Sequence, residues 1–208
     1  MVSRPMARRS AVAVDSGMCT SLRAPGTIET ARLVLRRPGA VDAPAVFARY
    51  AGDPLVTRYL GWRTHATVTE TQVFLACCDA EWRQTGVGPY VIESRENGEL
   101  LGSASLRMVS SQQAAAGYVL ARDAWGQGYA TEALHAMRGL ALRLGVLRVT
   151  GKCHPNHSAS LRVMQKCGFT REGLLRGHAQ FPNLAPGVAS DVLCCSYVFD
   201  TDWQPLVI

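Results

Sequence analysis

The 208-residue sequence lacks the features that would assign it at once to several structural classes. It has no internal repeat, no low-complexity tract and no apolar run of the roughly 20 residues needed to span a membrane. Its seven cysteines are odd in number, include two adjacent pairs and show no Cys-x-x-Cys spacing. This pattern argues against a disulfide framework and a structural zinc site. We therefore expect no bound metal, and cysteines that act as small core side chains in a reducing compartment, the cytoplasm.

Acidic residues are fewer than basic ones, 16 against 22, which gives a net charge of +6. The arginines are scattered, and no basic aromatic stripe or nucleic-acid-binding motif occurs, so we predict no nucleic-acid partner. A basic surface also suits an anionic cofactor. A hydrophobic content of 48% suffices for one core. We expect a disordered tail at residues 1–26 and one domain at 27–208, as a monomer or homodimer.

Hydrophobic patterns predict alternating strands and helices. Leu33 and Leu35 share one face of a first strand, Asp42 is a candidate helix cap, and Thr67-x-x-Glu70 is a capping box. The helix that this box opens carries an apolar stripe of Phe74, Cys77, Cys78 and Trp82. Further strands are predicted at 90–93, 100–106, 114–120, 146–150, 169–175 and 191–200, with a hairpin turn at 97–98 and an irregular loop at 177–190. This order predicts an α/β (α+β) fold, a mixed sheet with helices on both faces.

The stretch from Tyr118 to Ala133 is the most informative in the chain. A strand ends near Leu120, a glycine loop follows, and a helix then begins. One buried face of this helix is predicted from residues that recur at helical spacing: Ala130, Ala133, Leu134, Met137, Ala141 and Leu144. Gly126 and Gly128 lie where the loop becomes the helix; glycine accepts a positive φ and places no side chain between the backbone and a ligand. Unpaired N–H groups and the helix dipole at this point suit a phosphate or pyrophosphate. An ordinary strand-to-helix turn has the same pattern, so this stretch alone leaves both readings open.

A second motif follows at the appropriate distance, Ser160-x-Arg162-Val163-x-x-Lys166-x-Gly168-Phe169. Together with Trp125-Gly-Gln-Gly128-Tyr-Ala130 it resembles the GNAT family of acetyl-CoA-dependent N-acyltransferases. The resemblance is closest to the ribosomal-protein N-terminal acetyltransferase subgroup and covers roughly residues 27–199. It implies the GNAT fold, a mostly antiparallel twisted sheet with a splayed cofactor-binding strand. It also implies transfer of an acetyl group from acetyl-CoA to a primary amine, either a peptide or protein N-terminus or a small amine.

The resemblance implies a role for each matching position. The backbone of Tyr118, Val119 and Leu120 would hold the pantetheine and the thioester oxygen. Ser160 would protonate the departing thiolate, or would be a helix-start residue with no chemical role, and Tyr129 would pack over the cofactor. The helices here, including the one opened by the capping box at Thr67, would form a wall of the acceptor site, where Glu70, Asp79 and Glu81 could face a cationic substrate or simply be solvated. The pyrophosphate would lie on Trp125, Gly126, Gln127, Gly128, Tyr129, Ala130 and Thr131.

Three positions depart from the family pattern. The usual asparagine before Ser160 is His157, with Asn156 beside it, so either could contact the pantetheine. The strand glutamate that serves some members as a base falls at Ala115 or Ala116. A carboxylate common after the sixth strand is replaced by Gly177, which leaves His178 as a candidate base, and Asp191 matches a common family aspartate.

Two other functional classes remain to be compared. A dinucleotide-binding oxidoreductase is disfavoured, because Thr131 stands at the third glycine position and Arg148 about where the ribose-binding acid belongs. A catalytically inactive GNAT-like module that binds coenzyme A or a partner protein fits the lost carboxylates, but not the intact loop and Ser160.

Overall fold

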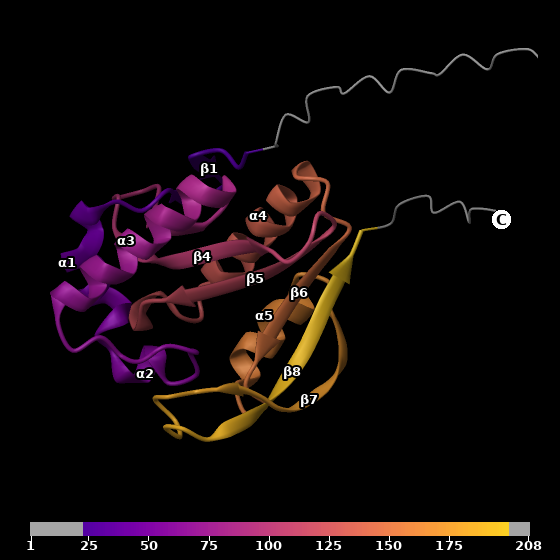
Figure 1. Cartoon of the computed structure of the whole chain (residues 1–208). Coiled ribbons are helices and arrows are strands. Elements are labelled where there is room, and N and C mark those ends of the chain that lie inside the picture. Colours follow the sequence, from indigo (N-terminus) through magenta and orange to yellow (C-terminus); the bar gives the residue numbers. More distant parts are fainter. Residues whose placement is uncertain (1–22, 200–208) are drawn as a thin grey trace, which may run out of the picture.

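The computed structural model of the chain describes residues 23–199 (Figure 1). The eight strands in this range form one sheet in the order β1-β2-β3-β4-β5-β6-β8-β7. All neighbouring strands are antiparallel except β5 and β6, which are parallel. The strands are β1 (Thr27–Glu29), β2 (Leu33–Arg36), β3 (Pro89–Ser94), β4 (Leu100–Met108), β5 (Gln113–Leu120), β6 (Arg148–Cys153), β7 (Thr170–Gln180) and β8 (Ala189–Val198).

Helices cover both faces of the sheet, as the alternation along β3 demonstrates. Val91 packs with Val46 and Tyr50 on one face, whereas Tyr90 and Ile92 belong to the larger core that includes the helix α4. The helices are α1 (Ala43–Val46), which continues as a π-helical turn (Phe47–Ala51), α2 (Pro54–Thr57), α3 (Val68–Thr85), α4 (Tyr129–Arg143) and α5 (Ser158–Lys166). The predicted mixed α/β fold is therefore confirmed. None of these described helices combines the length and apolarity needed to cross a membrane.

The parallel pair β5–β6 positions the functional site. The two strands are paired only from Gln113 to Ala115, opposite Arg148 to Thr150. Beyond that point they separate, and in Figure 1 they diverge from a shared end. Residues 116–120 of β5 keep β4 as their neighbour on one side and have no strand partner among the described residues on the other. The Leu120 carbonyl accepts a hydrogen bond from Trp125 Nε1. Other backbone groups on that free edge lack a strand partner among the described residues and can therefore pair with a ligand, since buried N–H and C=O groups need partners.

The helix α4 follows the predicted periodicity. Ala133, Leu134, Met137 and Ala141 are all buried against the sheet. Fully burying a side chain such as Leu134 or Met137 contributes about 1.5–3 kcal/mol. The predicted hairpin turn at Asn97-Gly98 is also present, with Gly98 at φ +71°. Because α4 packs against the sheet through this face, it also fixes the position of the glycine loop that precedes it in the chain.

One local prediction about helices is wrong, and a second is right at Cys78 and Trp82 but wrong at Cys77. Asp42 does not cap α1 with its side chain; it pairs with Arg36 at 2.7 Å and accepts a hydrogen bond from the Gly39 N–H, because a nearby guanidinium binds a carboxylate more strongly than a helix start does. On α3 the buried stripe is Thr71, Leu75, Cys78 and Trp82, and Cys77 is exposed. Because the buried face begins at Thr71 and continues through Leu75 and Cys78, Cys77 lies just outside it.

The predicted irregular loop at residues 177–190 is wrong in part. Strand β7 continues to Gln180, which pairs with Ala189 at the start of β8. The irregular segment is therefore confined to residues 181–188. The predicted tail, residues 1–26, lies mostly outside the described residues. Ala24 donates its N–H to the Gly86 carbonyl, so ordered contacts begin before residue 27.

Candidate active site

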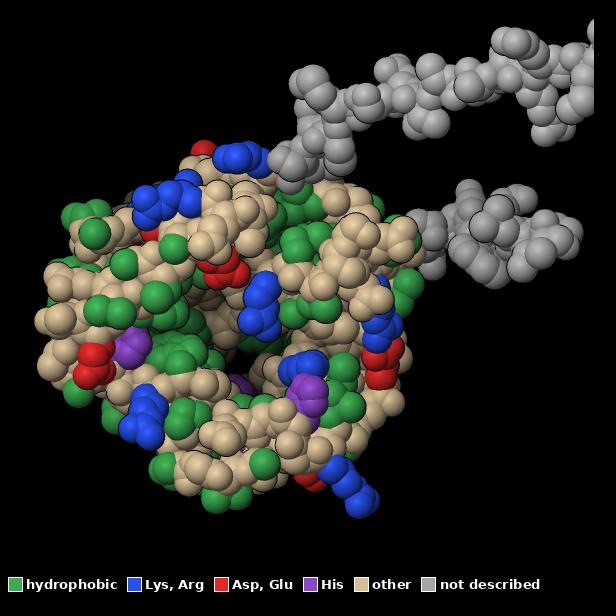
Figure 2. Space-filling view, in the orientation of Figure 1, with side chains coloured by type: hydrophobic (Ala, Val, Ile, Leu, Met, Phe, Trp, Pro, Cys, Tyr) green, Lys and Arg blue, Asp and Glu red, His purple; other side chains and the backbone are tan. Residues whose placement is uncertain are grey.

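A cavity of about 730 Å³ opens where β5 and β6 separate. Figure 2 shows it as a deep hollow near the centre of the molecule, with charged side chains around its rim. One side is lined by Leu134 of α4 and Met164 of α5, and the other by Phe74 and Glu81 of α3. Because these helices cover opposite faces of the sheet, the cavity passes through the sheet at the splay. Two ligands could therefore enter from opposite faces and meet.

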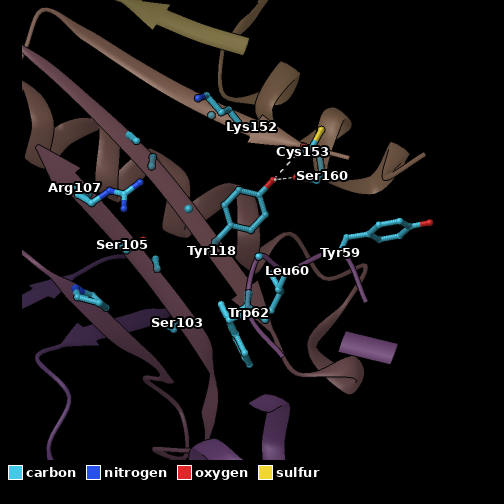
Figure 3. Close-up of a pocket in the computed structure, with 18 of the residues that line it drawn as sticks. Tyr59, Leu60, Trp62, Ser103, Ser105, Arg107, Tyr118, Lys152, Cys153 and Ser160 are labelled. Carbon is cyan, nitrogen blue, oxygen red and sulfur yellow. Dashed lines mark hydrogen bonds between the residues drawn. The ribbon is translucent and has the colours of Figure 1, made fainter. Parts of the chain in front are cut away.

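Tyr118 and Ser160 meet at the middle of the cavity. The Tyr118 hydroxyl lies 2.9 Å from Ser160 Oγ and donates to the Ser160 carbonyl at 3.1 Å (Figure 3). Burial raises the pKa of Tyr118, and the Ser160 hydrogen bond offsets only part of this rise. The phenol therefore stays protonated and holds the serine hydroxyl in place. Cys153 lines the cavity beside them, and burial raises the pKa of its thiol to about 11, so it is not a nucleophile at neutral pH.

The predicted glycine loop, residues 125–130, joins the end of β5 to α4. Gly126 and Gly128 have φ of +76° and +84°, the left-handed conformation that favours glycine. Gly128 is the N-cap of α4 and provides no capping side chain, so the first N–H groups of the helix remain open. A Cβ added at Gly126 would meet no atom within 4 Å. The loop thus presents bare backbone to solvent at a helix N-terminus.

Side chains inside the loop fold back onto it. Trp125 donates Nε1–H to the Leu120 carbonyl at 2.9 Å, and Gln127 donates Nε2–H to the Asp123 carbonyl at 2.7 Å. The Trp125 ring is 48% exposed. Ala130 and Thr131 lie in the first turn of α4. These contacts fix the loop conformation without occupying the open N–H groups.

Arg32, which lies just before β2, holds the loop from outside. Its guanidinium donates to the Gln127 carbonyl at 3.0 Å and to Glu132 at 2.8 Å, and it lies 4.6 Å from the centre of the Tyr129 ring. Glu132 also accepts from Thr30 Oγ1 at 2.7 Å. Burial would raise the Glu132 pKa, but the Thr30 and Arg32 hydrogen bonds outweigh it and lower the pKa. Tyr129 thus contacts Arg32, a partner that the sequence did not predict.

The residues before α5 form an aromatic cluster. His157 lines the cavity, and its ring stacks on Tyr59 with the centroids 4.8 Å apart. His154 stacks on the same tyrosine at 5.1 Å. Burial, and then the charge of His154, lowers the pKa of His157, so its imidazole is neutral at pH 7. Asn156 donates its backbone N–H to His154 Nδ1 and is exposed, so His157 is the better placed of the two predicted pantetheine contacts.

The predicted base, His178, lies on β7 outside the cavity lining. Its Nε2 is 2.7 Å from the Lys152 ammonium, which donates to it and occupies the lone pair that a base would use. Asp191 accepts the Gly177 N–H at 2.9 Å, a bond within the β7–β8 hairpin. The geometry therefore gives His178 no support as a base and Asp191 a structural contact.

The acids of α3 have separate environments. Asp79 pairs with Arg37 at 2.5 Å and with Arg83, and Glu70 accepts the Ala66 N–H at 2.8 Å near the helix start. Glu81 alone of the three lines the cavity. Of the three acids considered from the sequence, Glu81 is therefore the one placed to face a substrate.

Several cavity residues were not identified from the sequence. They include the side chain of Tyr118, the two cations Arg107 and Lys152, and an aromatic end of the cavity formed by Tyr59, Trp62, Phe74 and Phe181. The last four come from three separate segments and share no spacing. In the part of the chain that is described, no group of three or more His, Cys, Asp or Glu side chains is arranged to hold a metal ion.

Comparisons with known proteins agree with this architecture. The family model described as an acetyltransferase (GNAT) domain matches residues 32–170. The uncharacterized N-acetyltransferase p20 of Bacillus licheniformis is 28% identical over 155 residues, which cover 73% of this chain and 86% of p20. The relatives also include solved structures.

Two of these structures share the fold. RimL, described as a ribosomal L7/L12 alpha-N-protein acetyltransferase in complex with coenzyme A, has a TM-score of 0.73 at 23% identity, over 84% of this chain and 98% of RimL. RimJ of Mycobacterium smegmatis, in complex with a CoA-disulfide, has a TM-score of 0.69 at 24% identity, over 85% and 84% of the two chains. Because the family model matches residues 32–170, well over half of the 208-residue chain, the protein belongs to the GNAT acetyltransferase family and is an acyltransferase.

Proposed function

We propose that the protein transfers the acetyl group of acetyl-CoA to a primary amine by direct attack of the amine on the thioester. The observation that carries this proposal is the cavity through the sheet, with the Tyr118–Ser160 pair at its middle. One ligand can approach along the glycine loop and the free edge of β5. The other can approach from the α3 face, so that the reacting atoms meet beside Ser160.

The cofactor half would bind through backbone groups. The open N–H groups at residues 126–131 suit the pyrophosphate, since a helix N-terminus attracts anions. The free edge of β5 at Tyr118 to Leu120 suits the pantetheine amides, and His157 borders the same space. A backbone N–H aimed at the thioester oxygen would stabilise the oxyanion, and removing one such donor typically costs about 3–4 kcal/mol of barrier.

The reaction needs an acid for the departing thiolate and a base for the attacking amine, and the site offers a side chain for each. Ser160 would donate a proton to the departing thiolate while Tyr118 orients its hydroxyl. A thiol pKa of about 8.5 makes this leaving group easy to expel, so the acid contributes modestly. As a base, the neutral imidazole of His157 is better placed than His178, whose Nε2 faces an ammonium. Ordered water could complete the path from the acceptor amine.

Because the site offers only a weak base, acceptors whose amines have a low pKa, and are therefore partly neutral already, should react best. An α-amine with a pKa of about 7.8 is roughly one-seventh neutral at pH 7, whereas a lysine amine near 10.4 is neutral about once in 2,500. We therefore rank peptide and protein N-termini first, small amines of depressed pKa second and lysine side chains last. RimL, which shares the fold, is described as an alpha-N-protein acetyltransferase, and this agrees with the ranking.

The test is a thiol-release assay over peptides, aminoglycosides and free amines, with acetyl-CoA binding measured by calorimetry. A peptide with a free N-terminus and an internal lysine, acetylated at pH 7 and analysed by mass spectrometry, should carry the acetyl group on its N-terminus. Acetylation mainly on the lysine would contradict the ranking. Binding without turnover on any amine would favour an inactive coenzyme A-binding module, and absence of binding would refute the cofactor assignment.

A further inference from the structure

The floor of the cavity on the α3 face is a row of side chains on β4. Ser103, Ser105 and Arg107 alternate along the strand and therefore point to the same face. Their partners on β5 are Val119, Gly117 and Ala115. The last two are small, so nothing on β5 covers the Arg107 end of the row.

Arg107 has no partner in the described part of the chain: no ion pair within 4.0 Å and no hydrogen bond of its guanidinium is found there. The arginines on neighbouring elements differ from it. Arg36 pairs with Asp42 and Glu93, and Arg83 pairs with Asp79. In Figure 3 the guanidinium of Arg107 points from β4 toward the side of the cavity that holds Tyr118. Arg107 is exposed, so water satisfies its five donors when no ligand is present, and the guanidinium can bind an anionic or polar group that enters the cavity.

The charge of the cavity has the wrong sign for a simple cationic amine. Arg107 and Lys152 contribute two positive charges, and Glu81 is the one carboxylate among the lining residues. Glu81 lies within 4.0 Å of neither cation. A protonated amine without an anionic group would meet net repulsion. An amine that carries a carboxylate would be attracted by Arg107 instead.

Strand register gives the spacing between this cation and the reaction point. Arg107 is three residues along β4 from Ala104, the partner of Tyr118, so the side chains of Arg107 and Tyr118 start from opposite faces of the sheet and share only the cavity that passes through it. Three residues of strand span about 10 Å. The carboxylate should therefore lie one or two residues from the attacking amine. Trp62 and Phe74, whose rings stack at 5.8 Å, wall the other end of the row, near Ser103, so the rest of the acceptor would lie against aromatic rings.

We propose that Arg107 selects amine acceptors that bear a carboxylate within one or two residues of the amine. This rests on the proposed acetyl transfer and names its substrate class. The planar fork of arginine binds a carboxylate with two parallel hydrogen bonds, which fixes the orientation of the acceptor as well as its affinity. The carboxylate can be an acidic side chain near a peptide N-terminus or the main-chain carboxylate of a free amino acid or dipeptide.

Two matched pairs of acceptors distinguish these two sources of the carboxylate. The peptide amide Ala-Glu-Phe is compared with Ala-Gln-Phe, and the dipeptide Ala-Phe with its own C-terminal amide, with each rate corrected for the neutral fraction of the amine. We expect kcat/KM to favour the carboxylate by about ten- to hundredfold in at least one pair, as charged hydrogen bonds predict. The pair that responds identifies the source. Equal kcat/KM within both pairs would overturn the proposal and leave acetyl transfer intact.

Variants of Arg107 then test the residue. In R107Q the preference should fall to about one, R107K should retain part of it, and R107E should reverse it toward a peptide with lysine at the second position. The control is R83Q, an exposed arginine on α3 that pairs with Asp79 outside the cavity, which should keep the wild-type preference. A preference that survives in R107Q and R107E would refute the role of Arg107.

A second measurement does not depend on turnover. Calorimetry of the acetylated products, N-acetyl-Ala-Glu-Phe amide and its Gln analogue, on the coenzyme A-loaded protein should show the same preference, lost in R107Q. If no amine is acetylated, acetyl transfer fails, but the product titration still tests Arg107. If amines are acetylated and the titration shows no preference, only the selection by Arg107 fails.

Discussion

The proposed cofactor site lies mainly on one continuous stretch, residues 118–131, of which Tyr118 and Val119 line the cavity, whereas the aromatic end of the cavity collects side chains from segments between Tyr59 and Phe181. The first end consists mainly of backbone: open N–H groups, two glycines of positive φ and a free strand edge. The second consists of side chains, with four aromatic rings and the cations of β4 and β6. A backbone site leaves a local pattern in the sequence, and a side-chain site assembled by the fold does not.

This difference suggests how the two ends could vary. Backbone N–H groups bind any phosphate of suitable geometry, so the cofactor end can stay the same while the acceptor changes. The aromatic rings and Arg107 can be exchanged without disturbing the glycine loop, because they lie on other elements. Substitutions at the two ends should therefore affect different kinetic quantities: cofactor affinity at one end and acceptor preference at the other.

The largest effect is expected at the glycine loop. In G128E a side chain with like charge would lie against the pyrophosphate, at a residue whose φ of +84° already strains any side chain. Affinity for acetyl-CoA should fall at least a hundredfold, as measured by calorimetry. A matched pair isolates the ligand from the strain: G126A and G98A have similar φ, +76° and +71°, and neither added Cβ meets an atom within 4 Å. Both should lose similar stability, about 1 kcal/mol, but only G126A should weaken binding. Unchanged affinity in folded G128E would contradict the assignment of the loop.

An intermediate effect is expected where the two ends meet. S160A should lower kcat ten- to a hundredfold, the low part of the range for general acids, and leave acetyl-CoA affinity within about twofold. Y118F should lower kcat less, because it removes only the group that orients Ser160. S158A is the control, a serine in the first turn of the same helix that does not line the cavity. Turnover of S160A equal to that of S158A would assign Ser160 to structure.

Prediction from sequence succeeded where the information is local. The periodicity of α4 identified the buried Ala133, Leu134, Met137 and Ala141, and Asn97-Gly98 identified the hairpin turn. It failed where a tertiary contact decides the outcome. Asp42 looked like a cap, but Arg36, which also pairs with Glu93 of β3, binds it. Gln180 looked like loop, but its pairing with Ala189 extends β7. Hydrophobic periodicity and capping patterns report neither side-chain pairing nor strand register.

The candidate site divides in the same way. The glycine loop and Ser160 were named from motifs; Ser160 lines the cavity, and the loop follows β5, whose Tyr118 and Val119 also line it. The Tyr118 hydroxyl, Arg107 and Trp62 carried no signal, because one strand residue or one loop tryptophan is as common in a core as in a site. His178 was named from its place in the chain, and the structure turns it toward Lys152. Only tertiary structure could decide between His157 and His178 as the imidazole that faces the cavity.

The smallest effect is expected at Arg32, the side chain that joins the cofactor end to β2. R32M would remove a cation near the glycine loop, free the Gln127 carbonyl and leave Glu132 without its guanidinium partner. An unpaired carboxylate in the first turn of α4 opposes an anionic ligand, so acetyl-CoA affinity should fall about three- to tenfold, the range for a single partly exposed charge. The loss should shrink at high salt, because exposed charges are screened.

The matched control for R32M is R95M. Arg95 donates to the Thr30 carbonyl beside Arg32 but does not touch the loop, so its removal should leave affinity unchanged. Acid provides an independent check on the pair itself. Since the folded pKa of Glu132 is lowered, its stabilising contribution is complete above its unfolded pKa of about 4.3 and is lost as the pH falls through the folded value. Unfolding measured from pH 6 to 3 should therefore show a steeper acid loss in wild type than in R32M, whose Glu132 loses the hydrogen bond and charge of the Arg32 side chain but keeps the hydrogen bonds from Thr30 and the Arg32 backbone N–H. Two results would contradict this role of Arg32: equal slopes of stability against pH in wild type and R32M, and equal acetyl-CoA affinities in R32M and R95M. They would show that the contacts of Arg32 with Gln127 and Glu132 are not needed and that the backbone of residues 125–130 holds its conformation alone.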